Sequence, residues 1–305
     1  MKNQEIAQLF FEEFLGEKAT AFLALPQSGS ARMNFIGKSS NETYVITYNE
    51  NLLENEAFFY FTQVFSDLKL NTPQIFKINE ERKLYIQEFL GEKTLSEIIT
   101  LEGESERVKS LVKQTLKHLF ELQEKTQNKI DFSKTFEYEK YDELPITHDL
   151  YYFKNYLIDI LDLPYHKSTL LKEFKKIVQK IENLAPKSLM IRDFQARNIL
   201  VNDINEVFFI DYQAAMEGPA LYDVVSFLFQ AKANFSENFK NEMLEYYFSF
   251  HPLEQRNELE KSLKYCKMIR FIQVLGAYGF RGLIQRKPHF IGNFLGWQQV
   301  QNVVQ

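Results

Sequence analysis

Residues 188–211 constrain the fold of this chain more than any other stretch. An apolar run ends two residues before Asp193, a second begins directly after Asn198, and a third, residues 207–210, ends at Asp211. Short apolar runs bounded by polar turn residues are typical of strands. The spacing therefore predicts a loop and two short strands that bring the three polar side chains together.

These three side chains fit phosphoryl transfer from ATP. That reaction needs a carboxylate to orient and deprotonate the attacking hydroxyl, and hard oxygen ligands that hold Mg²⁺ against the phosphates. Asp193 is the candidate base, and Asn198 and Asp211 are the candidate metal ligands. Asp and Asn are also common turn residues, and an isolated pair would indicate no more than a turn. The apolar runs on both sides favour the functional interpretation.

The rest of the chain divides into a strand-rich first part and a helical second part. Phe58, Phe61 and Phe65 recur at helical spacing, which predicts one helix, residues 52–68, among the strands of the first part. We expect domains at 1–90, a nucleotide-binding β-sheet with one inserted helix, and 91–305, a helical lobe with the catalytic loop and acceptor site. The expected strands are 22–25, 42–48, 75–78, 83–89, 198–201 and 207–210, the later helices are 106–125 and one following Ser168, and 126–150 is expected as a loop or insert.

Composition excludes several classes of partner. A net charge of −5 over 305 residues gives no reason to expect nucleic acid. No window approaches ~18 uninterrupted apolar residues, so we expect no membrane span. The polar start of the chain and the single Cys266 fit a cytoplasmic protein with a buried, inert thiol. After Glu260 there are seven Lys and Arg residues and no acid, which predicts either a basic face paired with acids elsewhere or an electropositive wall beside a ligand.

Three motifs together resemble a known superfamily. They are the stretch from Asp193 to Asn198, Ile-Asp-Tyr-Gln at 210–213, and Gly-Pro-Ala-Leu-Tyr-Asp at 218–223. In combination they resemble the aminoglycoside phosphotransferase and choline kinase superfamily. The form with Gln213 and Gly-Pro-x-x-Tyr-Asp is most similar to bacterial anomeric kinases for N-acetylmuramate and N-acetylglucosamine.

This resemblance implies an α+β, two-lobed, protein-kinase-like fold with a small β-rich N-lobe and a larger, mainly helical C-lobe. It implies an ATP- and Mg²⁺-dependent kinase that phosphorylates the anomeric hydroxyl of an N-acetylated amino sugar in cell-wall sugar recycling. Asp193 would be the catalytic base, Asn198 and Asp211 would bind the metal, and Asp223 would brace the catalytic loop through its backbone N–H groups. Arg197 would contact phosphate or substrate, or form a surface salt bridge.

The nucleotide site is expected in the first lobe. Ser28, Gly29 and Ser30 lie between two strand-like runs, where their backbone N–H groups could cradle phosphates, although any hairpin turn has a similar composition. Arg32 follows within reach of the same phosphates. The segment that leaves the last strand of this lobe resembles the hinge that binds adenine, through Gln87, Glu88 and Phe89.

The chain departs from the family pattern at two positions. Kinases usually carry a lysine on the third strand that pairs with the α- and β-phosphates, whereas this chain has Thr47 there. Lys38 or Arg32 are the candidates to replace it, and we expect Glu56 on the following helix to have lost its partner. Ile191 stands where many relatives have a histidine. Because this lysine is missing, an inactive nucleotide-binding pseudokinase remains an alternative to an active kinase.

The acceptor is expected to be a neutral or anionic sugar. In the superfamily that the chain resembles, the segment after Glu260 packs against the acceptor cleft, and a segment without acids does not suit a polycation. Asp149, Tyr152, Gln213 and Arg281 are the candidate substrate contacts, with Arg270 and Gln273 as further candidates. Asp149 could equally be an acid at the start of a helix. Choline, homoserine and aminoglycosides remain the alternative acceptors, and the sequence gives no indication of oligomeric state.

Overall fold

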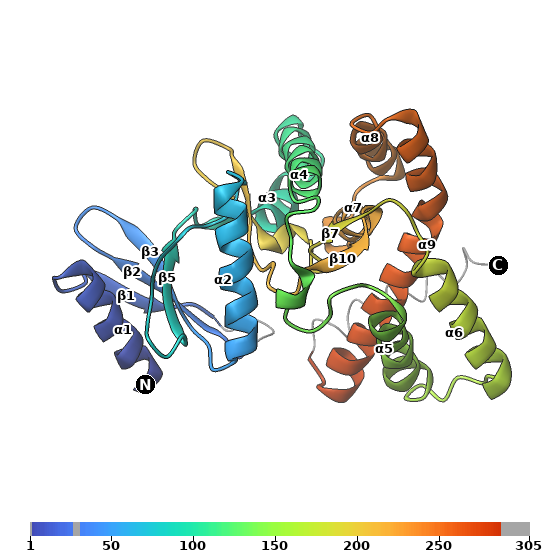
Figure 1. The fold of residues 1–305 in the computed structure, drawn as a ribbon, viewed down its shortest axis with the longest axis horizontal. Helices are drawn as coiled ribbons and strands as arrows, with labels where there is room; N and C mark the ends of the chain where they lie inside the picture. The colour runs from blue at the N-terminus through green and yellow to red at the C-terminus, as the bar shows by residue number, and fades with distance from the viewer. Residues whose placement is uncertain (1, 27–30, 288–305) are drawn as a thin grey trace.

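The computed structural model describes residues 2–26 and 31–287, which form two lobes (Figure 1). The small lobe contains a five-stranded sheet, and the large lobe is mainly helical. This arrangement confirms the predicted α+β, two-lobed fold.

The sheet of the small lobe is antiparallel, with the strand order β1-β2-β3-β5-β4. Its strands are β1 (Ala21–Ala24), β2 (Met33–Lys38), β3 (Thr43–Tyr48), β4 (Ile75–Ile78) and β5 (Leu84–Glu88). Successive side chains of a strand point to opposite faces. Phe35, Ile46 and Ile86 pack on one face against Phe10 and Phe11 of α1 (Lys2–Leu15), while the alternate residues face the nucleotide side.

Helix α2 (Leu52–Asp67) covers the second face of the sheet but belongs to the core of the large lobe. Its buried Phe58, Phe61 and Phe65 join the hydrophobic cluster that runs through the large lobe and includes Tyr85 of β5, whereas α1 and the opposite face of the sheet form a separate cluster. Tyr212 of the large lobe is fully buried against this helix. Its ring stacks on Phe58 with 5.1 Å between centroids, and its hydroxyl lies 2.8 Å from that of Thr62.

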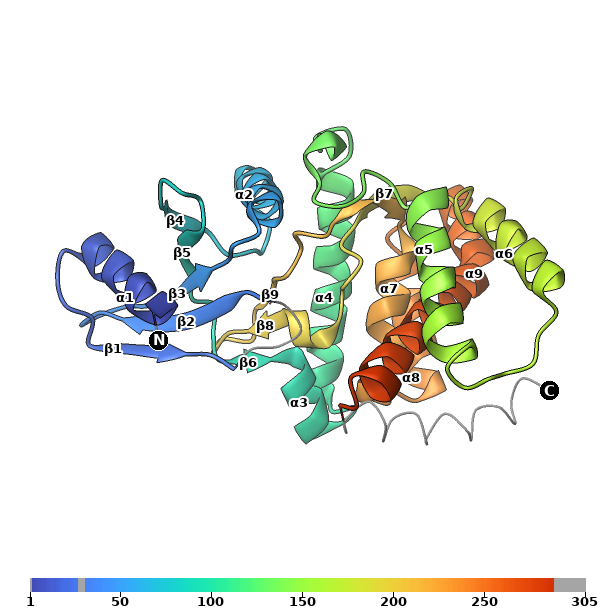
Figure 2. The same ribbon diagram turned by 90° about the horizontal axis from the view of Figure 1, so that it is seen from below.

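The large lobe is built from helices around two small sheets. Figure 2 shows α4 beside the sheet that contains β8 and β9, between the small lobe and the outer helices. The helices are α3 (Leu95–Glu102), α4 (Glu106–Lys125), α5 (Glu143–Phe153), α6 (Lys167–Ile181), α7 (Leu221–Leu228), α8 (Glu237–Phe248) and α9 (Leu253–Tyr278). Short 3₁₀ turns are η1 (Phe132–Lys134), η3 (Ala196–Asn198) and η4 (Ala231–Ala233), and π-helical segments are η2 (Lys154–Ile158) and η5 (Gly279–Ile284).

The two small sheets hold the predicted loop. One pairs β7 (Lys187–Met190) with β10 (Met216–Pro219), and the other has the order β6-β8-β9, formed by β6 (Lys93–Thr94), β8 (Ile199–Val201) and β9 (Val207–Phe209). Asp193 therefore leaves β7, Asn198 enters β8, and Asp211 leaves β9, as the apolar framing predicts.

The prediction that 126–150 is a loop is wrong for its last third. Helix α5 begins at Glu143, and the side chain of Asp142 caps it by accepting the backbone N–H of Leu144 at 3.1 Å. Pro145 is compatible with this helix because it stands in the first turn, where its missing N–H is not needed. Asp149 consequently lies inside the helix and is not its N-terminal acid.

Among the described residues, no helix is both long enough and apolar enough to cross a membrane.

Candidate active site

The loop that carries Asp193 is fixed by the buried carboxylate of Asp223. This carboxylate accepts the backbone N–H of Ile191 at 2.6 Å and that of Arg192 at 3.0 Å, which confirms the expected bracing contact. Burial raises the pKa of Asp223 to about 7, although the two N–H groups and Arg270 act in the opposite direction. Arg192 has a φ of 72°, a conformation that non-glycine residues rarely adopt. The brace thus holds a strained backbone directly before Asp193.

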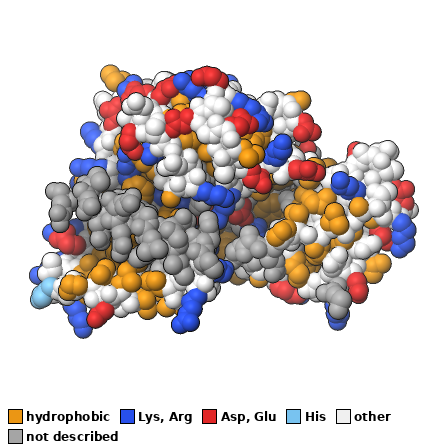
Figure 3. Space-filling model, turned by 180° about the vertical axis from the view of Figure 1, so that it is seen from behind, with side chains coloured by type: hydrophobic (Ala, Val, Ile, Leu, Met, Phe, Trp, Pro, Cys, Tyr) orange, Lys and Arg blue, Asp and Glu red, His pale blue; other side chains and the backbone are white. Residues whose placement is uncertain are grey.

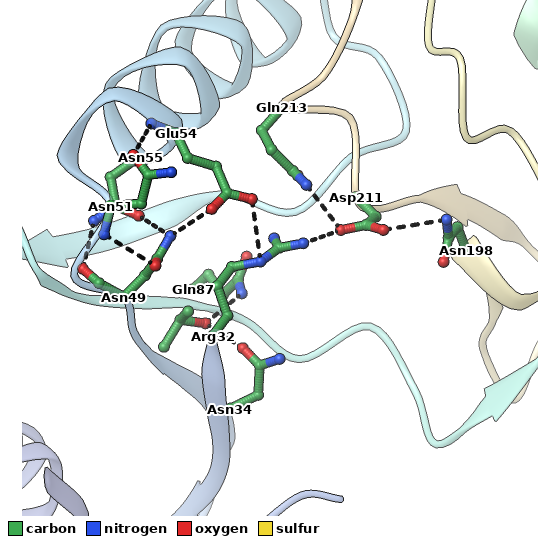
Figure 4. A network of polar contacts seen from close by, with 11 residues as sticks. Arg32, Asn34, Asn49, Asn51, Glu54, Asn55, Gln87, Asn198, Asp211 and Gln213 are labelled. Atoms are coloured by element: carbon green, nitrogen blue, oxygen red, sulfur yellow. Dashed lines mark hydrogen bonds and ion pairs between the residues drawn. The ribbon is translucent and has the colours of Figure 1, made fainter. Parts of the chain in front are cut away.

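The two candidate metal ligands are in contact with each other and with the loop (Figure 4). The amide nitrogen of Asn198 donates to the backbone carbonyl of Asp193 at 2.9 Å and lies 3.3 Å from Oδ2 of Asp211. Both contacts use Nδ2, so neither uses the amide oxygen Oδ1. Asp211 has a φ of 65°, which turns its side chain sharply away from the end of β9. The structure brings the side chains of Asn198 and Asp211 together with the backbone of Asp193.

Arg32 reaches this group from the small lobe. Its guanidinium forms a hydrogen-bonded ion pair with Oδ1 of Asp211, and its Nε lies 3.5 Å from Oε1 of Glu54 on α2. Burial opposes ionisation of Asp211, but Arg32 outweighs it and lowers the pKa of that carboxyl, helped by Gln213 and Arg197. Arg32 is thereby in direct contact with the predicted metal ligand Asp211.

The position of the usual strand-3 lysine is occupied by an uncharged cluster. Thr47 is 1% exposed, and its hydroxyl donates to Oδ1 of Asn34 at 2.8 Å and accepts from the Gln87 side chain at 3.2 Å. Lys38 lies at the far end of β2 and is exposed. Glu56 pairs with Arg82 on the outer side of α2, so the partner that it has is not a residue of β3. Glu54 is the residue that faces inward.

The predicted adenine contacts lie at the end of β5 and in the connection that leads to the large lobe. Gln87 directs its side chain to Thr47, and Glu88 donates its backbone N–H to the carbonyl of Gln74. Phe89 follows β5, in the connection to β6. Ser28, Gly29 and Ser30 lie outside the described residues. Figure 3 shows that the surface is hollowed between the lobes, with basic and acidic side chains at the border of the hollow.

Asp149 is buried behind the catalytic loop. Its Oδ1 lies 3.1 Å from a guanidinium nitrogen of Arg192, and its Oδ2 accepts the Tyr141 hydroxyl at 2.8 Å. Both carboxylate oxygens are therefore engaged, and the side chain is 4% exposed. Arg270 is also buried and donates to Gln273 at 2.6 Å. These residues form a charged layer beneath Asp193 instead of an open acceptor surface.

Tyr152 and Arg281 lie together on the large lobe, where the two π-helical segments meet. The Tyr152 ring lies 4.7 Å from that of Tyr156 and 5.9 Å from that of Phe280. Burial raises the pKa of the Tyr152 hydroxyl, while the positive charge of Arg281 acts in the opposite direction. The packing depends on Gly279, because a Cβ there would stand 2.2 Å from the carbonyl oxygen of Tyr156.

Gln213 and Arg197 flank Asp211 from two sides. The Gln213 amide nitrogen donates to Oδ1 of Asp211 at 3.1 Å, and its buried Oε1 has no hydrogen-bond partner among the described residues. Arg197 is exposed on η3. Its charge contributes to the low pKa of Asp211.

The donor set fits Mg²⁺. Within residues 2–26 and 31–287, no group of three or more His, Cys, Asp or Glu side chains could hold a metal ion. One carboxylate and one amide oxygen are nevertheless what Mg²⁺ takes from proteins when phosphates and waters complete its shell. Asp211 and Asn198 are the residues that would supply them.

Sequence reasoning missed Glu54, although the helical period contains the signal. Glu54 precedes Phe58 by four residues and so shares the inward face of α2, while Glu56 lies on the opposite face. Asn51 followed by Glu three residues later is also a helix-start pattern, and Asn51 caps α2 by accepting the Glu54 N–H at 3.3 Å. The ion pair of Arg192 with Asp149 was missed as well, and it has no local signal because 43 residues separate the partners.

Comparison with proteins of known structure places the fold. Choline kinase LicA from Streptococcus pneumoniae is 12% identical and superposes with a TM-score of 0.59, covering 93% of this chain and 98% of that chain. The AMP-bound spectinomycin phosphotransferase APH(9)-Ia is 15% identical, with a TM-score of 0.64 and coverage of 95% and 94%. Plasmodium vivax ethanolamine kinase is 16% identical, with a TM-score of 0.58 and coverage of 89% and 79%. The likeness shows the protein-kinase-like fold.

Sequence comparison identifies the family. Curated protein sequences give no match. The profile of the phosphotransferase enzyme family (APH) matches residues 25–258, which include the catalytic loop, both candidate metal ligands and Asp223. Since the match spans well over half of the chain, this protein belongs to the phosphotransferase enzyme family.

Proposed function

We propose that this protein is an ATP- and Mg²⁺-dependent kinase that phosphorylates the anomeric hydroxyl of an N-acetylated amino sugar, such as N-acetylmuramate or N-acetylglucosamine. The observation that carries the kinase assignment is the contact between Asn198, the Asp193 carbonyl and Asp211. It joins the backbone of the residue that carries the candidate base to the side chains of the two candidate metal ligands.

In this mechanism Asp193 orients the acceptor hydroxyl and accepts its proton. The acceptor oxygen forms a bond to the γ-phosphorus of ATP as the bond to the β,γ-bridging oxygen breaks, and ADP leaves. Mg²⁺ held by Asp211 and Asn198 would neutralise charge on the phosphates. Asp223 keeps the base in place, because it holds the backbone on the N-terminal side of Asp193.

The nucleotide would bind between the lobes, with its adenine at the connection that follows β5. No described residue forms a backbone hydrogen bond with Phe89, Leu90 or Gly91, so their polar groups remain available for a base. Gln87, Glu88 and Phe89 are the proposed hinge contacts, and Ser28, Gly29, Ser30 and Arg32 the proposed phosphate contacts. Solved relatives of this fold were crystallised with AMP and with ADP.

The acceptor would lie on the large-lobe side of Asp193. Gln213 supports this placement, since its buried Oε1 is unpaired next to Asp211. Tyr152 and Arg281 are the proposed sugar contacts further out, with the basic side chain suited to a neutral or anionic acceptor. Asp149 acts through Arg192 in this proposal, because both of its oxygens are already engaged. Arg197 would contact phosphate during transfer.

A choline-type amino alcohol is the second candidate acceptor. The rings of Tyr152, Tyr156 and Phe280 lie within 4.7 to 5.9 Å of one another, and aromatic groups of this kind bind quaternary ammonium ions. Relatives of the same fold include a choline kinase and an ethanolamine kinase. The nearby Arg281 favours the sugar over the cation.

The test is a coupled assay of ADP release with Mg·ATP and, in turn, N-acetylmuramate, N-acetylglucosamine, choline, homoserine and kanamycin. Turnover with an amino sugar supports the proposal, and turnover with choline alone supports the second candidate. Asp193→Asn should lower kcat by a factor of about 100 or more while Mg·ADP affinity is retained. Nucleotide binding without turnover on any acceptor would instead identify an inactive nucleotide-binding module.

A further inference from the structure

We propose that Arg32 replaces the strand-3 lysine of kinases as the cation that binds the nucleotide phosphates, and that its ion pair with Asp211 disfavours binding of the metal ion alone. The metal ion then binds together with the nucleotide and not before it. The inference rests on the proposed kinase function and specifies which residues control access to its metal site.

The first step is that β3 offers no place for a cation. Thr47 is buried and its hydroxyl is engaged by Asn34 on one side and Gln87 on the other. All three side chains are uncharged, and they complete one another's hydrogen bonds across β2, β3 and β5. A lysine at this position would lose these bonds and bury its charge among neutral groups.

The second step is that Arg32 points to the same side of the sheet as Thr47. Asn34 pairs with Thr47 in the register of β2 and β3, and side chains two residues apart share a face. Arg32 precedes Asn34 by two residues at the entrance to β2. Figure 4 shows its guanidinium extending past Asn34 and Gln87 to lie between Glu54 and Asp211.

The third step is that Glu54 is built to hold this arginine. Its backbone is fixed at the start of α2 by the Asn51 cap, and its Oε2 accepts the amide of Asn49 at 2.9 Å. Its other oxygen, Oε1, lies 3.5 Å from Arg32 Nε. The pair Glu54–Arg32 therefore links a helix to a strand in the way that a glutamate and a lysine do in kinases, with both residues at new positions.

The fourth step concerns what Arg32 does to Asp211. The guanidinium forms a hydrogen-bonded ion pair with Oδ1 of Asp211, the carboxylate that would hold the metal. A cation arriving alone must compete with Arg32 for that carboxylate and leaves the arginine with one anionic partner fewer. Nucleotide phosphates give Arg32 a replacement partner, so the exchange is favourable when metal and nucleotide arrive together.

The test measures two affinities by titration calorimetry, that of Mn²⁺ alone and that of ADP at saturating Mg²⁺. Arg32→Met should bind Mn²⁺ alone several-fold more tightly than the wild type and should bind Mg·ADP about tenfold more weakly, equivalent to about 1.4 kcal/mol. Arg32→Lys keeps the positive charge but loses the planar guanidinium with its several donors. Its affinities for Mn²⁺ and for Mg·ADP should lie between those of the wild type and those of Arg32→Met. Opposite changes in the two affinities are the signature of the proposed exchange.

The matched control is Arg82→Met. Arg82 pairs with Glu56 on the outer side of the same helix, so its loss removes an ion pair of α2 away from Asp211 and should change neither affinity. Equal affinities of wild type and Arg32→Met, or a fall in both affinities, would overturn the inference. A wild type that binds no Mg·ADP would instead contradict the proposed function, which keeps the two failures distinct.

Discussion

Asp223 accepts the backbone N–H of Ile191 at 2.6 Å from within a fully buried site, 32 positions along the chain. Asp223 also accepts the backbone N–H of Arg192, so two hydrogen bonds fix the loop directly before Asp193. Desolvation raises the pKa of this carboxyl to about 7, above its ordinary value of 3.8. The residue that holds the catalytic loop is therefore also a residue whose ionisation affects stability.

This relationship predicts a pH dependence of unfolding. Because the folded protein binds the Asp223 proton more tightly than the unfolded chain, the stabilisation is fully present below pH 3.8 and is lost as the pH rises to about 7. Urea denaturation of the wild type should show a contribution that falls across this window. Asp223→Asn should lack this contribution and, through the lost N–H acceptor, should be less stable by about 1–3 kcal/mol. Parallel pH profiles for the two proteins would contradict the assignment.

The buried ion pair of Asp149 and Arg192 predicts a strong asymmetry between single and double variants. The two side chains are 4% and 12% exposed, so Asp149→Asn leaves a buried guanidinium without its counter-ion and should cost about 3–5 kcal/mol. The combined variant Asp149→Leu with Arg192→Met removes both charges and should be more stable than Asp149→Asn. Chemical denaturation of the wild type and the two variants measures this, and a double variant less stable than Asp149→Asn would contradict the prediction.

Gly279 should tolerate no side chain. An alanine Cβ would meet the Tyr156 carbonyl oxygen at 2.2 Å, so Gly279→Ala should lower the free energy of unfolding by about 3 kcal/mol and disturb the aromatic cluster around Tyr152. Gly103→Ala is the control, because a Cβ there meets nothing within 4 Å and only its φ of 60° opposes the change, at a cost of about 1 kcal/mol. Similar melting temperatures for both variants would show that the clash is relieved.

Cys266 should be unreactive in the folded protein. It is fully buried on α9, and desolvation raises the pKa of its thiol to about 12. A thiol reagent at pH 8 should therefore label the native chain negligibly and should label one site after denaturation in urea. Rapid labelling without denaturant would indicate that α9 opens locally.

The candidate site was predictable because its signals are local. Asp193, Asn198 and Asp211 each sit at the end of an apolar run, and the runs became β7, β8 and β9. Helix α2 was likewise encoded by its phenylalanine period. In these cases the pattern that predicts a strand or helix lies within the residues of that strand or helix.

The charged pairs were not predictable in the same way. Arg32 meets Asp211 across 179 positions, and Arg192 meets Asp149 across 43. Such pairs depend on how the lobes and helices pack against one another. The spacing of residues within one helix or strand contains no information about that packing. Helix α5 was missed for a different reason, since Pro145 and the polar stretch that precedes the helix resemble a loop until Asp142 is recognised as its cap. Asp149 and Arg270 were expected to contact the substrate, but both side chains are buried. Their burial depends on the packing of separate helices, which the local sequence does not indicate.

The burial of Tyr212 has a consequence for how the two lobes are joined. This residue follows Asp211 directly, and it packs into α2 against Phe58 and Phe65, with its hydroxyl beside that of Thr62. The same helix is held against the five-stranded sheet, because Phe58 and Phe59 pack on Tyr85 and the Asn55 amide donates to the carbonyls of Asn49 and Arg82. Helix α2 is therefore the element through which the sheet and the end of β9 contact each other. A change that loosens α2 would alter the position of Arg32 relative to Asp211 even though it touches neither residue.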